Sequence, residues 1–314
     1  MNTKTPLPSL AEVKDGIDTL LAVEKWDLYK MKRSPRLFKK RLDALFFRNL
    51  KVLPHIVYLT NELSVPKRFY RLRKQTRSFN ESLISEYSYP PNELVKSVQR
   101  ANIPYHPVFY CSDNPITAIQ ETLKGEAKNT DIFYMSEWSV RENVKLNVFP
   151  FLFDNVDPHN PYKTMSDYNR IRLFEELGEY SIDEKNAMLE ILKFLSNLFI
   201  YEDTYVVSSY LAYNYLYAQH EYRPDIFVYP SVRMAKKTVN FAFHPNCVAE
   251  KLQLKRVFKL QLPNYDKLNK RYNLRVTWLA HNVDGILHWR EADQDTETGK
   301  AVREELKNTF GPNS

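Results

Sequence analysis

A small set of polar side chains has the residue types needed for chemistry, although its members are far apart in the chain. They are three arginines, an asparagine, a tyrosine, a glutamate and a serine: Arg71, Arg73, Arg100, Asn102, Tyr110, Glu121 and Ser231. Forked guanidinium groups can bind phosphate oxygens bidentately, and a positioned carboxylate can stabilise a developing positive charge. Taken singly, each residue is unremarkable. The chemistry therefore depends on whether the fold brings these residues together.

Each candidate also has an ordinary structural interpretation. Arg73 suits a surface ion pair, and Tyr110 suits a core position because tyrosines on strands are usually packed. Ser231 follows Tyr-Pro and suits a turn. Helical spacing places Ile116, Ile119 and Leu123 on the core face of one helix, which leaves Glu121 off that face, either at a cleft rim or simply in solvent. Tyrosines 210, 213 and 217 form a helical stripe that we assign to the core.

Other common reactive sites are not favoured by the sequence. None of the seven histidines has the paired helical spacing of a zinc site, and no serine lies in a glycine-flanked elbow. The two cysteines, Cys111 and Cys247, each lie in an apolar run that predicts a buried strand, which argues against a thiol nucleophile. The six glycines cannot be assembled into a dinucleotide fingerprint or a phosphate-binding loop. We expect no metal and no glycine-rich nucleotide site.

The composition indicates a folded, soluble globular protein. The 314 residues include 43% hydrophobic and 26% charged residues, which is ordinary for a globular chain. Mean hydropathy is −0.51, and no apolar run is long enough for a membrane span or a secretory signal. We therefore expect a cytoplasmic protein that does not associate with a membrane.

Basic charge is concentrated in one part of the chain. Residues 25–77 contain sixteen Lys and Arg but only three acidic residues, which gives +13, so that the net charge of +7 leaves −6 for the remainder. Clustered cations are typical of surfaces that bind nucleic acid. Solvated faces of helices explain the same pattern, and we prefer that interpretation, so nucleic acid is the less favoured partner.

Apolar periodicity and turn residues divide the chain into predicted elements. Helices are expected in three stretches: 8–50, 115–124 and 166–222. Strands are expected in nine: 68–72, 108–111, 132–140, 144–153, 226–229, 239–243, 256–262, 276–282 and 286–289. Strands early, helices in the middle and strands late predict an α+β fold with a mixed, mainly antiparallel sheet and packed helices.

Local signals place several element boundaries. Pro35 predicts a break in the first helical stretch, and Pro115 suits the first position of the helix that follows strand 108–111. Ser181 and Glu184 have the spacing of a capping box. The charged tail from Glu291 is expected to be mobile.

Four short motifs, in chain order, resemble the RES domain, a family named for an arginine, a glutamate and a serine. Phe69-Tyr70-Arg71 is similar to its opening strand, and Gln99-Arg100-Ala101-Asn102 is similar to its arginine–asparagine segment. The strand at 108–112 and the helix start at 117–121 resemble the unit that carries its glutamate. The segments 226–233 and 240–243 resemble its serine segment and closing strand. Gln99 and Ala101 replace a usual glycine and aromatic, and 235–238 lacks a usual glycine.

This resemblance covers about residues 67–262 and implies three regions. Residues 1–66 would form a basic helical extension, 67–262 a RES-like catalytic domain related to the ADP-ribosyltransferase toxins, and 263–314 a hairpin and charged tail. The resemblance implies a toxin or defence enzyme that consumes NAD as substrate by cleaving its nicotinamide–ribose bond, with water or phosphate as acceptor. It also implies a helix-turn-helix antitoxin protein as partner.

The resemblance assigns roles to individual residues. Glu121, Arg71, Tyr110 and Ser231 would be catalytic, with Glu121 beside the ribose and Tyr110 offering a flat face to nicotinamide. Five residues would bind substrate: Arg100, Asn102, Tyr70, Arg73 and Asn240. Two alternatives stay open, namely transfer of ADP-ribose to a macromolecule and a nucleic-acid-binding module that uses the basic segment 25–77.

Overall fold

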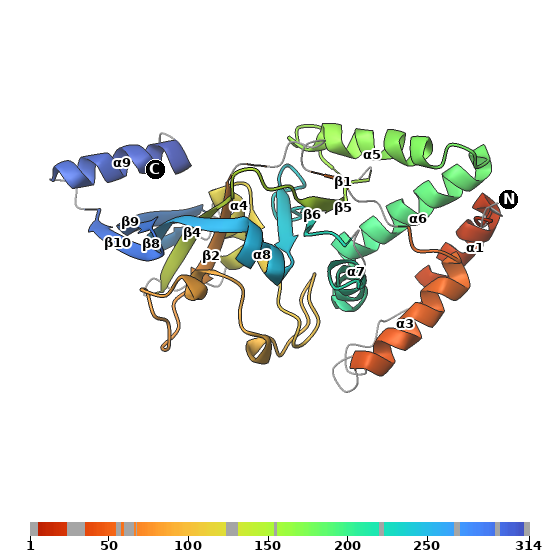
Figure 1. Ribbon diagram of the computed structural model, residues 1–314, viewed down its shortest axis with the longest axis horizontal. Coiled ribbons are helices and arrows are strands. Elements are labelled where there is room, and N and C mark those ends of the chain that lie inside the picture. The colour runs from red at the N-terminus through yellow and green to blue at the C-terminus, as the bar shows by residue number, and fades with distance from the viewer. Residues whose placement is uncertain are drawn as a thin grey trace.

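The computed structural model of the chain describes residues 6–23, 35–54, 58–59, 66, 68–123, 131–153, 156–219, 223–266, 271–292 and 296–310. One sheet crosses the molecule, and five of the helices gather around the end formed by β1, β5 and β6 (Figure 1). These helices are α1 (Leu10–Leu21), α3 (Pro35–Leu50), α5 (Lys163–Glu176), α6 (Ile182–Tyr201) and α7 (Val206–Leu216). Helix α9 (Glu297–Phe310) lies at the opposite end, over β9 and β10.

The described residues form a ten-stranded sheet in the order β1-β5-β6-β7-β3-β2-β4-β8-β9-β10. Every neighbouring pair is antiparallel except the parallel pair β5–β6. The strands are β1 (Tyr58–Leu59), β2 (Phe69–Lys74), β3 (Phe109–Ser112), β4 (Ile132–Val140), β5 (Asn147–Pro150), β6 (Ile226–Pro230), β7 (Val239–Phe243), β8 (Leu252–Asp266), β9 (Arg271–Val283) and β10 (Ile286–Glu291). The predicted α+β class with a mixed, mainly antiparallel sheet is confirmed.

Several local predictions are confirmed. Pro35 is the first residue of α3, and α4 (Pro115–Leu123) begins at Pro115. Ser181 and Glu184 form a reciprocal capping box at the start of α6, which satisfies backbone N–H groups that the helix itself leaves unpaired. Strands β4 and β7 have the predicted bounds.

Two predictions about the last third of the chain are wrong. Helix α8 (Pro245–Lys251) was not predicted, and it places Cys247 on a helix rather than on a strand, although the thiol is buried as expected. The tail predicted to be mobile forms α9, which Thr309 links to the sheet by accepting a hydrogen bond from Arg256 of β8. Helix α8 is too short to give a detectable period, and the charged composition of α9 suggested a solvated tail.

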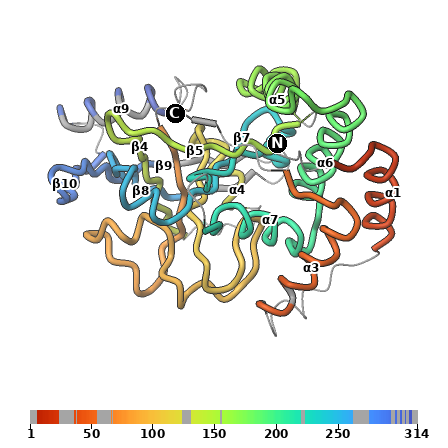
Figure 2. The backbone as a smooth tube through the Cα atoms, turned by 45° about the vertical axis from the view of Figure 1, so that its right-hand side comes forward, coloured from red at the N-terminus to blue at the C-terminus, as the bar shows by residue number. Residues whose placement is uncertain are grey.

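The main hydrophobic cluster joins residues of the N-terminal helices to residues of the sheet. Val13 of α1 and Phe46 of α3 belong to the same cluster as Phe227 of β6 and Val257 of β8. Strands β9 and β10 continue the same sheet beyond β8. The backbone trace shows α1 and α3 lying beside α6 and α7 (Figure 2). The division at residues 66 and 262 stays a prediction. Among the described helices, none is long and apolar enough to cross a membrane.

The sheet is weakly joined between β2 and β3. Strand β2 pairs with β4 over six residues, from Phe69–Trp138 to Lys74–Phe133. Among the described residues it pairs with β3 only through Tyr70 and Ser112. The two strands therefore diverge beyond this pair and leave room for side chains between them.

Candidate functional site

A cavity of about 660 Å³ lies where β2 and β3 separate. Its walls come from these two strands, from α4, from the ends of β6 and β7, and from the loop at residues 97–100. Six of the predicted site residues line it: Tyr70, Arg71, Arg100, Tyr110, Glu121 and Asn240. The fold thus brings together residues that are up to 170 positions apart in the sequence.

A row of four paired residues crosses the sheet at this cavity. Tyr70 of β2 pairs with Ser112 of β3, Ser112 pairs with Asn240 of β7, and Asn240 pairs with Tyr229 of β6. Residues directly opposite one another in paired strands project from the same face of a sheet. All four line the cavity, so this face of the sheet forms its floor.

Glu121 stands on α4 at one side of the cavity, and its carboxylate is fixed by neutral donors. Its Oε1 accepts hydrogen bonds from Ser231 Oγ at 2.6 Å and from Asn240 Nδ2 at 2.7 Å. Its Oε2 lies 3.7 Å from Nε of Arg233, and 30% of the side chain is exposed. Glu121 is therefore not a freely solvated helix residue. Of the three apolar residues predicted beneath it, Ile119 and Leu123 are buried, but Ile116 is exposed.

The donors to Glu121 are themselves held in place. Ser112 Oγ donates to Asn240 Oδ1 at 2.7 Å, which turns the amide NH₂ of Asn240 toward the carboxylate. Ser231 is fully buried, and its backbone N–H donates to the Thr238 carbonyl at 2.9 Å. The carboxylate thus sits in a preorganised polar setting that does not depend on water.

The loop from Ser231 to Thr238 contains backbone strain. Ala235 and Lys236 have positive φ angles of 50° and 63°, a region that costs a residue with a Cβ about 1–2 kcal/mol. Asn160 holds this conformation by donating from Nδ2 to the carbonyls of Lys236 at 2.7 Å and Thr238 at 3.2 Å. The loop that lacks the family's usual glycine therefore still adopts a conformation that favours glycine.

Arg71 reaches the cavity from β2 without an acidic partner. Nη1 donates to the Tyr110 carbonyl at 3.1 Å, the guanidinium lies 5.3 Å from the Phe109 ring centre, and the buried Nε has no hydrogen-bond partner. Burial, followed by the nearby charge of Arg73, lowers the pKa of Arg71 to about 10. Among the described residues no carboxylate forms an ion pair with it, so the site holds an uncompensated positive charge.

Arg100 provides a second guanidinium, placed by the end of a helix. Its Nη1 donates to the carbonyls of Phe199 and Ile200 in the last turn of α6, where the helix dipole favours a cation. The guanidinium also lies 4.9 Å from the ring centre of Tyr205, which lines the cavity. Tyr205 precedes α7 with a φ of 61°, an uncommon conformation for a bulky residue.

Tyr110 and Asn102 support the arginine loop. The Tyr110 hydroxyl accepts a hydrogen bond from the Ala101 backbone N–H at 2.8 Å and donates to Asn102 Oδ1 at 2.9 Å. Burial is the main cause that raises the pKa of Tyr110 above its usual range. Asn102 is itself buried and donates to the Ser97 carbonyl at 3.1 Å. Both residues orient the segment that carries Arg100, and Asn102 does so from outside the cavity wall.

Tyr70 and Arg73 complete the set of predicted residues. Tyr70 lines the cavity but is only 5% exposed, and burial, followed by the charge of Glu137, raises its pKa. The structure does not bring Arg73 to this cavity. Its Nη1 forms an ion pair with Glu86 at 3.0 Å, as the structural alternative predicted.

Sequence reasoning missed other residues of this site, three of which carry aromatic or charged side chains. Tyr205, Tyr229 and Arg233 all line the cavity, and none was predicted as a site residue. Tyr229 and Arg233 lie within the segment that resembles the serine motif, so their positions were a usable signal. No pattern in the sequence indicates Tyr205, which depends on the packing of α7 against α6.

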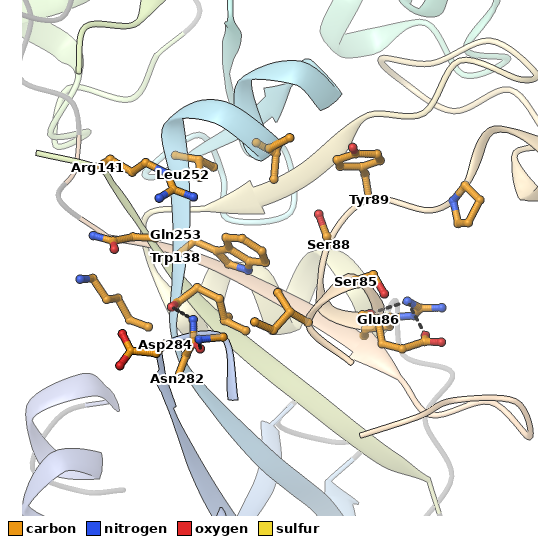
Figure 3. Close-up of a pocket in the computed structure, with 18 of the residues that line it drawn as sticks. Ser85, Glu86, Ser88, Tyr89, Trp138, Arg141, Leu252, Gln253, Asn282 and Asp284 are labelled. Atoms are coloured by element: carbon orange, nitrogen blue, oxygen red, sulfur yellow. Dashed lines mark hydrogen bonds and ion pairs between the residues drawn. The ribbon is translucent and has the colours of Figure 1, made fainter. Parts of the chain in front are cut away.

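A larger cleft of about 970 Å³ lies elsewhere, between the loop around Glu86 and Tyr89 and the turn between β9 and β10 (Figure 3). Trp138, Arg141 and Gln253 line its other side. In this larger cleft the carboxylate of Glu86 is neutralised by Arg73. Among the residues that line the cleft, Arg73 is the one that was predicted as a site residue. The smaller cavity is therefore the better candidate, because it combines a fixed carboxylate with two arginines, Arg71 and Arg100, that form no ion pair with any described carboxylate.

Within the described part of the chain, no three His, Cys, Asp or Glu side chains converge as metal ligands would. No family model matches the sequence, and no curated protein matches it either. The candidate site therefore rests on its own geometry.

Proposed function

We propose that the chain is an enzyme that consumes NAD by cleaving the bond between nicotinamide and ribose. The observation that supports this best is the presence, in one cavity, of a fixed carboxylate and of two arginines, Arg71 and Arg100, that have no acidic partner among the described residues. A dinucleotide carries a diphosphate for the arginines and a ribose that becomes positive as nicotinamide leaves. The cavity volume of about 660 Å³ lies in the range of small-molecule sites.

The proposed reaction needs no cofactor or further substrate besides NAD and the water or phosphate that accepts the ribosyl group. The bond between ribose C1′ and the pyridinium nitrogen breaks, and its electron pair stays on nicotinamide, which leaves as a neutral molecule. The ribose passes through an oxocarbenium-like state and takes an oxygen from water, which then loses one proton, or from phosphate. Glu121 would face the positive carbon, and Arg71 and Arg100 would bind the diphosphate bidentately.

The presence of charges of both signs in the cavity supports this orientation. Glu121 is held by α4 and by β7, whereas Arg100 is held by the end of α6 and Arg71 extends from β2. A substrate with one cationic and one anionic group finds a group of opposite charge for each in this cavity. Tyr110 contributes by orienting the Arg100 loop, because its hydroxyl is engaged by Ala101 and Asn102.

The test is release of nicotinamide from NAD by purified protein, measured by chromatography with and without phosphate. Glu121→Gln keeps the shape of the side chain and removes its charge, so we expect a loss of at least about 100-fold in kcat. Glu250→Gln, on the exposed surface of α8, is the matched control and should leave the rate unchanged. Both variants should melt like the wild type.

The outcome separates the proposal from its alternatives. Unchanged NAD in the presence of folded wild-type protein contradicts it. Label from NAD that stays on protein or nucleic acid would identify an ADP-ribosyltransferase. Tight and steeply salt-dependent binding of DNA or RNA that Glu121→Gln does not alter would instead support a nucleic-acid-binding module.

A further inference from the structure

Tyr229 is a buried tyrosine in the cavity whose hydroxyl has no hydrogen-bond partner among the described residues. Only 6% of the residue is exposed, and the ring packs at a centre distance of 5.1 Å against Phe199. The Tyr229 hydroxyl does not belong to the polar atoms that are sealed from solvent without a partner, so it opens to the cavity, where a bound group can pair with it. Two other buried tyrosines have protein partners, because Tyr215 donates to the Pro54 carbonyl and Tyr87 to the Glu81 carbonyl, whereas the hydroxyl of Tyr134 is buried without one.

The sheet register shows which way Tyr229 points. It pairs with Asn240, whose side chain reaches Glu121, so Tyr229 projects from the same face toward the same cavity. Burial raises the pKa of Tyr229 well above its usual range, Tyr110 and Glu121 raise it further, and Arg100 lowers it. The hydroxyl is therefore protonated at neutral pH, and it lies within electrostatic reach of both the carboxylate and one arginine.

We infer that Tyr229 binds substrate through its hydroxyl and recognises a hydroxyl group of the ribose that lies between Glu121 and the arginines. This rests on the proposed function, and it adds a specificity residue to that site. The part of a dinucleotide between the reacting carbon and the diphosphate is the ribose, whose free polar groups are hydroxyls. A neutral donor at this position pairs with such a group, and a substrate without it would leave the tyrosine unpaired.

The test combines a variant with altered substrates. Tyr229→Phe removes one oxygen and keeps the ring against Phe199, so the protein should melt at the wild-type temperature or above it. We expect kcat/KM for NAD to fall about tenfold. Wild-type protein should lose about as much with one of two NAD analogues that lack the 2′- or the 3′-hydroxyl of the nicotinamide ribose. In Tyr229→Phe, kcat/KM for that analogue should equal kcat/KM for NAD.

Tyr215→Phe is the matched control, because Tyr215 is equally buried but does not line the cavity. It should lose stability and keep the wild-type kcat/KM. The inference is wrong if kcat/KM of Tyr229→Phe for NAD equals the wild-type value. It is also wrong if both analogues still lower kcat/KM in Tyr229→Phe as much as in the wild type. In either case the proposed function stands.

A second measurement separates failure of the inference from failure of the proposed function. If wild-type protein consumes no NAD, the proposed function fails, and binding of ADP-ribose measured by calorimetry then decides the role of Tyr229. A Kd at least about fivefold weaker in Tyr229→Phe supports it. An equal Kd, or no binding to the wild type, overturns it.

Discussion

The position of Arg71 reduces the stability of the folded protein. Its Nε is buried and unpaired, and no described carboxylate pairs with the guanidinium, which lowers the stability of the fold, so its retention suits a group that binds an anion. We expect Arg71→Met to stabilise the protein by about 1–3 kcal/mol and to raise KM for NAD at least about tenfold. Thermal melting and steady-state kinetics measure the two effects.

Arg170→Met, on the exposed face of α5, is the control for this change and should alter neither quantity. A large loss of stability in Arg71→Met with unchanged KM would show that Arg71 serves the fold rather than the site.

The strain in the loop beside Ser231 leads to a second prediction, which concerns the stability of a single-residue variant. Ala235 is exposed and has a φ of 50°, so Ala235→Gly relieves strain and should stabilise the protein by about 0.5–1 kcal/mol. The same substitution at Ala249, within α8, should cost about 1 kcal/mol because glycine is a poor helix former. Chemical denaturation measures both, and equal effects of the two changes would contradict the strain.

The sequence identified six of the residues that line the cavity, but not how they are held. Residue type and order were enough for Glu121, Arg71 and Asn240, because ordered motifs are visible without a structure. The unpaired hydroxyl of Tyr229 was not predictable, since it depends on the pairing of β6 with β7. Arg73 was misplaced because alternation along a strand does not show which cleft a side chain enters.

At the scale of elements, the contact between α1 and α3 depends on a glycine. A Cβ added at Gly16 would lie 2.1 Å from the carbonyl oxygen of Asn49, which is closer than real contacts allow. Gly16→Ala must therefore push the helices apart, and we expect a loss of about 1–3 kcal/mol by denaturant unfolding. Lys14→Ala, on the exposed side of α1, should change stability by less than about 0.5 kcal/mol.

Helix α8 is capped by a histidine, which makes its stability depend on pH. His244 Nδ1 accepts a hydrogen bond from the Asn246 N–H, which requires the neutral ring. Burial, followed by the charge of Arg223, lowers the pKa of His244 to about 4, below its ordinary 6.5. The stabilisation is therefore complete above pH 6.5 and is lost as pH falls through about 4.

We expect His244→Asn, which retains a capping acceptor that does not titrate, to reduce the loss of stability between pH 6.5 and pH 4. Melting temperatures across this interval measure the effect. An identical pH dependence in wild type and variant would assign the titration to other groups.

Elements with strong periodicity or clear caps were predictable, and those set by tertiary contacts were not. Helix α6 carries both a capping box and a long apolar face, so its start was found from the sequence. Helix α8 has seven residues and follows β7 after a single residue, which left no signal. Helix α9 is amphipathic, but its charged composition suggested a solvated tail.

For the whole molecule, the N-terminal helices belong to the main core. Five of their apolar residues are at most 4% exposed: Val13, Leu20, Leu42, Phe46 and Leu50. Their burial contributes on the order of 10 kcal/mol, comparable to the net stability of a typical domain. Removing residues 1–54 would also expose apolar surface on α6 and α7.

We therefore expect a chain of residues 66–314 to show no cooperative thermal transition by circular dichroism. A chain of residues 1–292, which lacks α9, is the control and should still melt cooperatively, because none of the described side chains of α9 belongs to the main cluster. A sharp transition in the chain of residues 66–314 would show that the predicted division at residue 66 marks an independent folding unit.

The single residue pair between β2 and β3 has a mechanical consequence. Five strands lie on each side of this junction, and Arg71 stands on one side while Asn240 stands on the other. A molecule that touches both residues spans the seam and ties the two half-sheets together. Filling the cavity therefore stiffens the sheet at its weakest joint, and tearing the half-sheets apart takes more force with the ligand in place than without it.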